Sequence, residues 1–123
     1  MIYKQALETI ERWLDDKKIR IFCRLACGGR CCVPHEVHCI KRCERPPLLC
    51  SMYLCDEIRK IIFGFHNGEK YQDIYHKINR IIADAGYDPM KLMDPEINLN
   101  IPDKLINTLV HMRYDDDIHI FKR

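Results

Sequence analysis

Apolar residues recur at helical spacing over the first 18 residues of the chain. They lie three and four positions apart and leave the charged side chains on the opposite face, which predicts an amphipathic helix over residues 2–18. Its inward face comprises Tyr3, Ala6, Leu7, Ile10, Trp13 and Leu14. Trp13 carries the largest apolar surface of these residues, so we expect it to anchor a hydrophobic core.

Two more helices are predicted in the middle of the chain. The first covers residues 51–66 and ends at Asn67-Gly68, because glycine readily terminates a helix. The second covers residues 69–85 and ends at Gly86. The residues expected to be buried are Leu54, Ile58, Ile61, Ile62 and Phe65 in the first helix, and Tyr71, Ile74, Tyr75, Ile78, Ile81 and Ile82 in the second. Together the two helices predict an antiparallel hairpin.

Three short segments alternate apolar and polar residues, namely 19–22, 97–101 and 118–121. Such alternation is typical of strands, so they predict a small β-sheet beside the helices. A helical turn is expected at residues 89–93 and a helix at residues 102–112. The second of these would bury Leu105, Leu109 and Met112.

All eight cysteines lie between residues 23 and 55. They are Cys23, Cys27, Cys31, Cys32, Cys39, Cys43, Cys50 and Cys55. Disulfides or metal ions take up thiols in such numbers, and cytosolic thiols stay reduced. Charged residues interrupt every apolar run in residues 1–18, so we expect neither a signal peptide nor a membrane span, and therefore a cytoplasmic protein. Metal binding is then the favoured use of the cysteines, with disulfides and buried thiols as the alternatives.

The residues around the cysteines also favour metal binding. Gly28-Gly29 allows a turn that brings the neighbouring sulfurs round a common centre. A helix is predicted over residues 34–44, with His35, Cys39 and Cys43 on one face. Eight thiolates would complete two tetrahedral zinc sites, and His35 or His38 would join fewer thiolates in a mixed site. An iron–sulfur cluster also takes four cysteines, so the spacing leaves zinc and iron open.

The segment that holds most of the cysteines is also basic. Residues 17–45 contain eight basic residues against Glu36 and Glu44. Those expected to contact nucleic acid are Arg20, Arg24, Arg30, Lys41, Arg42 and Arg45. A zinc ion with four thiolates carries a formal charge of about −2, so the same residues would also neutralise a metal site.

The double cysteine carries a family resemblance. Gly28 and Cys31-Cys32, followed by Cys39, by Arg45-Pro46 and by Cys50 with Tyr53, resemble the zinc- or iron-chelating cysteine cluster domain of small bacterial proteins and flagellin lysine methylases. The resemblance covers residues 23–53 and implies metal chelation by Cys23, Cys27, Cys31, Cys32, Cys39 and Cys50. Cys43 and Cys55 have no counterpart in the family's pattern, and the first two cysteine spacings are each one residue wider than usual.

These observations predict a single domain over residues 1–123, with an N-terminal helix and strand (1–22), a cysteine-rich metal-binding segment (23–55) and a helical remainder (56–123). The expected fold class is mainly α with a small α+β component, in which a metal-stapled segment packs on a helical bundle with a short sheet. Without the metal, we expect the first half of the chain to lack a definite shape.

The favoured function is a zinc-binding protein whose cysteine cluster is structural and supports interaction with a partner protein. An iron–sulfur or open-site metal enzyme is the first alternative, and a nucleic-acid-binding regulator is the second. The chain contains no Gly-rich phosphate loop, nucleophile elbow or paired-histidine zinc-protease motif, so no particular enzyme class is indicated.

Overall fold

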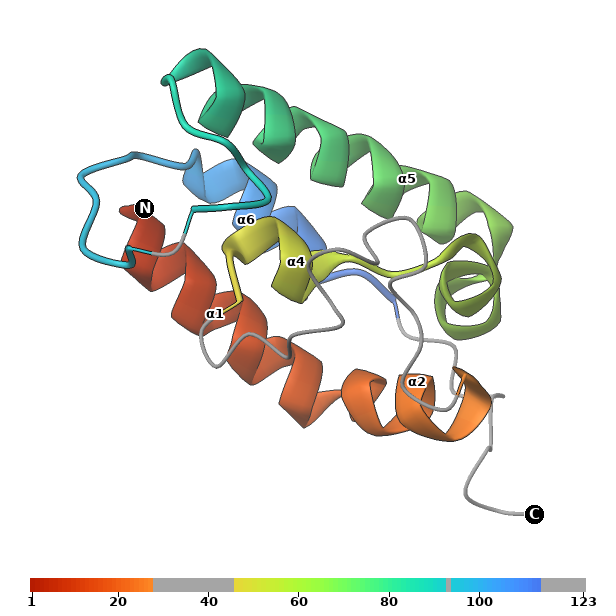
Figure 1. Ribbon diagram of the computed structural model, residues 1–123. Helices are drawn as coiled ribbons and strands as arrows, with labels where there is room; N and C mark the ends of the chain where they lie inside the picture. Colours follow the sequence, from red (N-terminus) through yellow and green to blue (C-terminus); the bar gives the residue numbers. More distant parts are fainter. Residues whose placement is uncertain (28–45, 93, 114–123) are drawn as a thin grey trace.

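The computed structural model describes residues 1–27, 46–92 and 94–113, with the backbone alone at residues 23, 24, 26 and 27 (Figure 1). These ranges form helices α1 (Tyr3–Asp16), α2 (Ile19–Cys27), α4 (Leu48–Met52), α5 (Asp56–Asp84) and α6 (Asp103–Val110). The prediction of a mainly α fold is therefore confirmed. None of the described helices is long and apolar enough to cross a membrane.

Helix α1 forms where the apolar stripe predicted it. The residues that it buries are Tyr3, Ala6, Ile10, Trp13 and Leu14. The helix ends at Lys17, and Lys18 follows with a φ of 57°, a left-handed conformation that turns the chain into α2. Trp13 is 6% exposed, as expected of a core anchor.

The predicted strand at residues 19–22 is wrong, because this segment begins α2. Ile19 and Phe22 are buried and lie three positions apart, which is helical spacing. A run of only four residues therefore fits the period of a helix as well as that of a strand. Residues 97–101 contribute only an isolated bridge between Ile2 and Asn100. Segment 118–121 lies outside the described residues, and the described ranges contain no β-sheet.

Helix α5 continues through the predicted boundary at Asn67-Gly68 and is kinked at Gly64 instead. Gly64 has φ 78° and ψ 177°, a conformation that is nearly restricted to glycine. We call the parts before and after Gly64 the short arm and the long arm. The predicted antiparallel hairpin is wrong, since Figure 1 shows the short arm nearly end-on while the long arm runs across the view.

The kink also changes which side chains of α5 are buried. Ile58 and Ile62 are buried as predicted, but Ile61 and Phe65 are 43% and 59% exposed. Phe63 is buried in their place, because the break at Gly64 ends the helical register of the short arm. In the long arm, five of the six predicted residues are buried and Ile81 is partly buried. Gly86 terminates this arm with φ 90°, as predicted.

A stack of three aromatic rings joins α1 to both arms of α5. The ring centroids of Trp13 and Phe63 are 5.9 Å apart, and those of Phe63 and Tyr71 are 5.5 Å apart. Trp13 also lies 6.2 Å from Tyr71. Aromatic pairs of this kind contribute about 0.5–1.5 kcal/mol beyond the burial of their surface.

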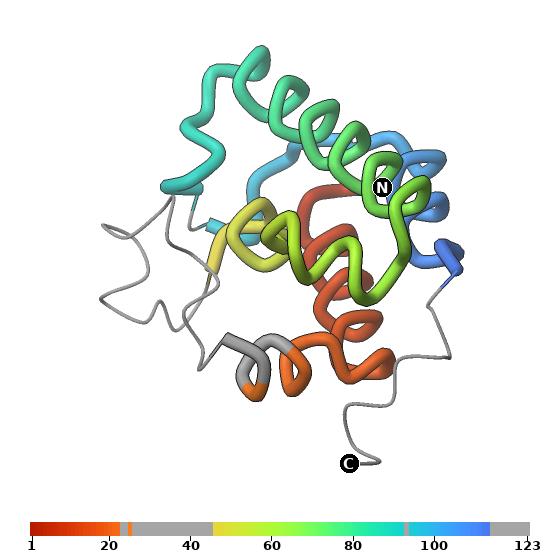
Figure 2. Tube along the Cα trace, turned by 90° about the vertical axis from the view of Figure 1, so that its right-hand side faces the viewer, coloured from red at the N-terminus to blue at the C-terminus, as the bar shows by residue number. Residues whose placement is uncertain are grey.

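Helices α4 and α6 each contact both α1 and α5, and Figure 2 shows them on opposite sides of α1. Helix α6 starts after Pro102 and buries Ile106 and Leu109, with Met112 buried just beyond its end. Leu105, which was predicted to be buried, is only partly so. Residues 89–91 form a turn at the place where a helical turn was expected.

Candidate metal centre

The cysteine-rich segment leaves and rejoins the helical core at fixed points. Cys23 and Cys27 belong to α2, and Cys27 is its last residue. Their spacing of four places both positions on one face of the helix. Cys50 belongs to α4 and Cys55 directly precedes α5. The remaining candidate ligands, Cys31, Cys32, Cys39, Cys43, His35 and His38, lie outside the described residues, as does the predicted helix at 34–44.

Cys50 is held in place by the burial of its neighbours. Leu48, Leu49 and Met52 of α4 are all 0% exposed, whereas Cys50 is half-buried. The Cys50 Sγ lies 4.0 Å from the carbonyl oxygen of Met90. Because the rest of α4 is packed in the core, the position of this thiol is set by the fold.

Tyr3 connects α1 to the start of α4. Its hydroxyl accepts a hydrogen bond from the N–H of Leu48 at 2.8 Å and donates one to the carbonyl of Leu92 at 3.4 Å. Burial raises the pKa of Tyr3; the bond from Leu48 opposes this effect, and the charge of Cys50 adds to it. Tyr3 is therefore a neutral phenol at physiological pH.

Cys55 occupies the N-cap position of α5. Its carbonyl oxygen accepts a hydrogen bond from the N–H of Arg59 at 2.9 Å, and its side chain is half-buried without capping the helix. Within the described part of the chain, no disulfide involves Cys50 or Cys55. The two sulfurs that the structure describes are therefore chemically able to bind a metal ion after losing a proton.

In the described part of the chain, no three His, Cys, Asp or Glu side chains are close enough together to hold a metal ion. A tetrahedral site needs four donors, so a site at Cys50 or Cys55 would take ligands from residues 23–45.

The candidate nucleic-acid contacts are described at Arg20 alone. Its guanidinium lies 4.0 Å from a carboxylate oxygen of Glu11 and 3.8 Å from one of Asp15. These acids partly neutralise Arg20, which makes it a weaker phosphate ligand than the sequence suggested. Of the other residues, Arg24 has no described side chain, and Arg30, Lys41, Arg42 and Arg45 lie outside the described residues.

Sequence reasoning missed two surface cavities that tertiary packing creates. One, of about 480 Å³, lies at the kink of α5 and contains Arg59, whose guanidinium binds Asp56 and the carbonyl of Leu54. The other, of about 660 Å³, is formed by α5 and α6. We call it the α5–α6 groove, and its lining residues are Asn67, Lys70, Lys104, Asn107, Thr108, His111, Met112 and Arg113. The one signal in the sequence was the polar stripe of Lys104, Thr108 and His111 at helical spacing.

Comparison with known proteins adds no identification, because no protein-family model, curated protein or solved structure matches this chain. The chemistry of its own residues is therefore the basis for assigning a function.

Proposed function

We propose that residues 23–55 bind zinc, that the ion has a structural role, and that the folded segment supports binding of a partner protein in the cytoplasm. The proposal depends chiefly on eight cysteines in one segment whose two ends are fixed by the core. Ile19 and Phe22 fix α2 at one end, and Leu48, Leu49 and Met52 fix α4 at the other.

The composition between these ends supports a metal ion as the source of folding energy. Residues 28–45 contain only Val33, Val37 and Ile40 as large apolar side chains. That supply cannot offset the conformational entropy lost when the segment is ordered. Zinc binding by cysteine-rich peptides contributes roughly 10–16 kcal/mol, which is sufficient.

The resemblance to the cysteine cluster domain family supports the same proposal. It favours Cys23, Cys27, Cys31, Cys32, Cys39 and Cys50 as ligands, with Cys43 and Cys55 available to complete a second site. An iron–sulfur cluster would use the same thiolates, so metal analysis is needed to separate the two.

The surface of α2 supports a role in protein binding. Ile21 and Leu25 are 44% and 61% exposed and lie four positions apart, so they form one apolar stripe. Exposed apolar stripes are typical of protein interaction sites. This stripe lies on the helix that leads into the cysteine segment, so it fits an apolar helix or strand of a partner.

The core also restricts what the metal ion has to stabilise. Residues 3–22 are packed through apolar side chains of α1 and α2. We therefore restrict the dependence on metal to the cysteine segment and do not extend it to the whole first half of the chain.

Elemental analysis and an absorption spectrum of protein purified without oxygen test the proposal. We expect zinc and no visible colour, with less metal in Cys32→Ser, Cys39→Ser and Cys50→Ser. His66→Ala and His119→Ala serve as controls and should retain the wild-type metal content. Equal metal content in all five variants would contradict the ligand assignment, and iron with visible absorption would favour the redox alternative.

A further inference from the structure

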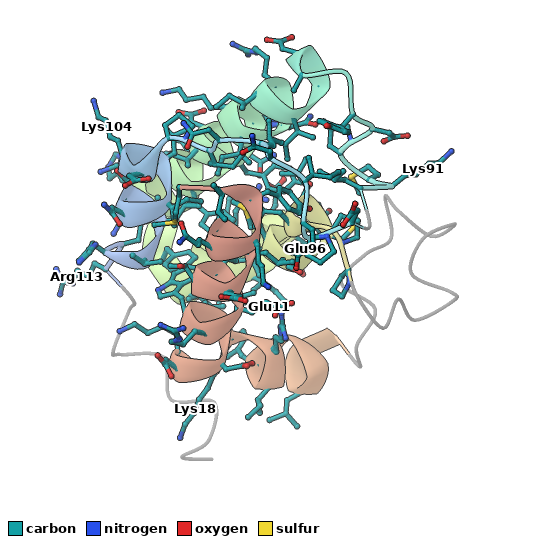
Figure 3. All side chains as sticks on the ribbon, turned by 90° about the vertical axis from the view of Figure 1, so that its left-hand side faces the viewer. Glu11, Lys18, Lys91, Glu96, Lys104 and Arg113 are labelled. Atoms are coloured by element: carbon teal, nitrogen blue, oxygen red, sulfur yellow. The ribbon has the colours of Figure 1, made fainter. Side chains whose placement is uncertain are left out.

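The α5–α6 groove is a cationic surface cavity. Its lining contains Lys70, Lys104 and Arg113, and none of the described residues that line it is acidic. Figure 3 shows the side chains of Lys104 and Arg113 on the same side of the molecule, opposite Lys91. Lys70 reaches the groove from the long arm of α5, so the three charges come from separate parts of the chain.

Among the described residues, the acidic neighbours of Lys70 and Lys104 in the sequence do not compensate these cations. Asp103, the one acidic residue of α6, binds the N-terminal ammonium group. Glu69 precedes Lys70 but lines the cavity at the kink of α5. Within the described ranges, Lys70, Lys104 and Arg113 form no ion pair. Three positive charges without an ion pair among the described residues, placed around one groove, favour an anionic ligand.

The polar side chains of the groove are of the kind that bind phosphate. Asn67 and Asn107 carry amide donors. The Nδ1 of His111 lies 2.7 Å from the carbonyl oxygen of Asn107, and a carbonyl only accepts, so Nδ1 carries the proton. The Thr108 hydroxyl donates to the carbonyl of Lys104 at 2.7 Å. These bonds hold the side chains of Thr108 and His111 against the backbone, so the asparagine, lysine and arginine groups remain as donors.

The groove lacks a surface for an organic ring. Met112 is the only large apolar residue among the described residues that line it, and it is 7% exposed. Pockets for small organic ligands are mostly apolar and enclosed, whereas the charged residues that line this groove are exposed. The lining therefore matches a chain of phosphate groups better than a mononucleotide.

We propose that the α5–α6 groove binds consecutive phosphate groups of an extended polyanion and does not recognise bases. The phosphodiester backbone of a nucleic acid and inorganic polyphosphate share this chemistry. Lys70, Lys104 and Arg113 supply the charge, and the asparagines supply further donors. No described cysteine lines the groove, and the proposal does not rest on the proposed zinc site.

Fluorescence anisotropy with a labelled 20-nucleotide single-stranded DNA, at several salt concentrations, tests the proposal. The triple variant Lys70→Gln, Lys104→Gln, Arg113→Gln should bind about tenfold more weakly, and its dependence of log Kd on log salt should be shallower by about 2. The matched control is Lys77→Gln, Arg80→Gln, Lys91→Gln, which removes the same charge from other exposed positions. It should retain most of the wild-type affinity and slope.

Competition identifies the source of the phosphates. Unlabelled DNA and inorganic polyphosphate are each tested as competitors of the labelled probe. A competitor that displaces the probe from the wild type, but binds the triple variant less well, supports the proposed site and identifies its ligand. Equal weakening in the triple variant and its control would overturn the proposal, because total charge would then explain binding.

The Asp115–Asp117 run follows Arg113 outside the described residues. Binding that appears only after these residues are changed to asparagine would also overturn it.

Discussion

The hydroxyl of Tyr3 accepts a hydrogen bond from the backbone N–H of Leu48 at 2.8 Å, and both groups are buried. This bond joins the first turn of α1 to the first residue of α4, two positions before Cys50. Tyr3 precedes the cysteine-rich segment in the sequence, and Leu48 lies near the end of that segment. The bond between them therefore fixes the point at which the segment returns to the core.

Replacing Tyr3 by phenylalanine should destabilise the protein. The change leaves the buried N–H of Leu48 without its acceptor, which costs about 1–3 kcal/mol. Chemical denaturation measures the loss as a lower midpoint. Tyr87→Phe is the control, because Tyr87 is 38% exposed, and it should change stability by less than about 0.5 kcal/mol. Equal midpoints for the two variants would contradict the role of this bond.

The raised pKa of Tyr3 predicts a loss of stability in alkali. The unfolded chain releases this proton near its ordinary pKa of 10.0, whereas the folded protein retains it to higher pH. The contribution is fully present below pH 10.0 and is lost as the pH rises through the folded value. Denaturation midpoints between pH 8 and 11 should therefore fall more steeply for the wild type than for Tyr3→Phe. Parallel curves would show that Tyr3 is not responsible.

The two glycines of α5 should respond differently to alanine. Gly64 has open space around its Cα, but its backbone conformation is nearly restricted to glycine, so Gly64→Ala should cost about 1–3 kcal/mol. At Gly68 a Cβ would lie 3.3 Å from the carbonyl oxygen of Arg59, a tight contact that a small shift of the backbone at Arg59 would relieve. We expect a smaller loss there, because alanine has the higher helix propensity. Thermal denaturation of both variants checks the order, and a larger loss at Gly68 would contradict it.

Removal of metal should leave the packing of Trp13 intact. This residue is the only tryptophan, and it packs on Phe63 and Tyr71, which lie outside residues 23–55 in the sequence. Treatment with a strong zinc chelator under reducing conditions should change the circular dichroism of the cysteine segment without moving the emission maximum of Trp13. A shift to the emission of urea-unfolded protein would show that the whole core depends on the metal.

Long apolar stripes predicted the helices well, and short patterns did not. Helix α1 follows from the positions of Tyr3, Ile10 and Trp13, because 14 residues of consistent spacing admit no strand. The four residues from Ile19 to Phe22 fit both periods, and only their packing on α1 decides for a helix.

Tertiary contacts account for the features that sequence reasoning missed. In the sequence, either Gly64 or Gly68 could terminate a helix. In the structure Gly68 lies inside α5 and allows close packing against the backbone of Arg59, and the break occurs at Gly64. The α5–α6 groove unites Lys70 with Lys104, which no local pattern relates. For the candidate metal centre, the sequence predicts the ligand types, and the structure adds the fixed positions of Cys50 and Cys55.

The most direct test of the proposed zinc site is a paired count of metal ions and reactive thiols in one anaerobic preparation. We predict at least one zinc ion per chain, with most of the eight cysteines unreactive toward a thiol reagent until a chelator is added. A metal-free protein in which all eight cysteines react at once, with an unchanged circular dichroism spectrum, would contradict the account.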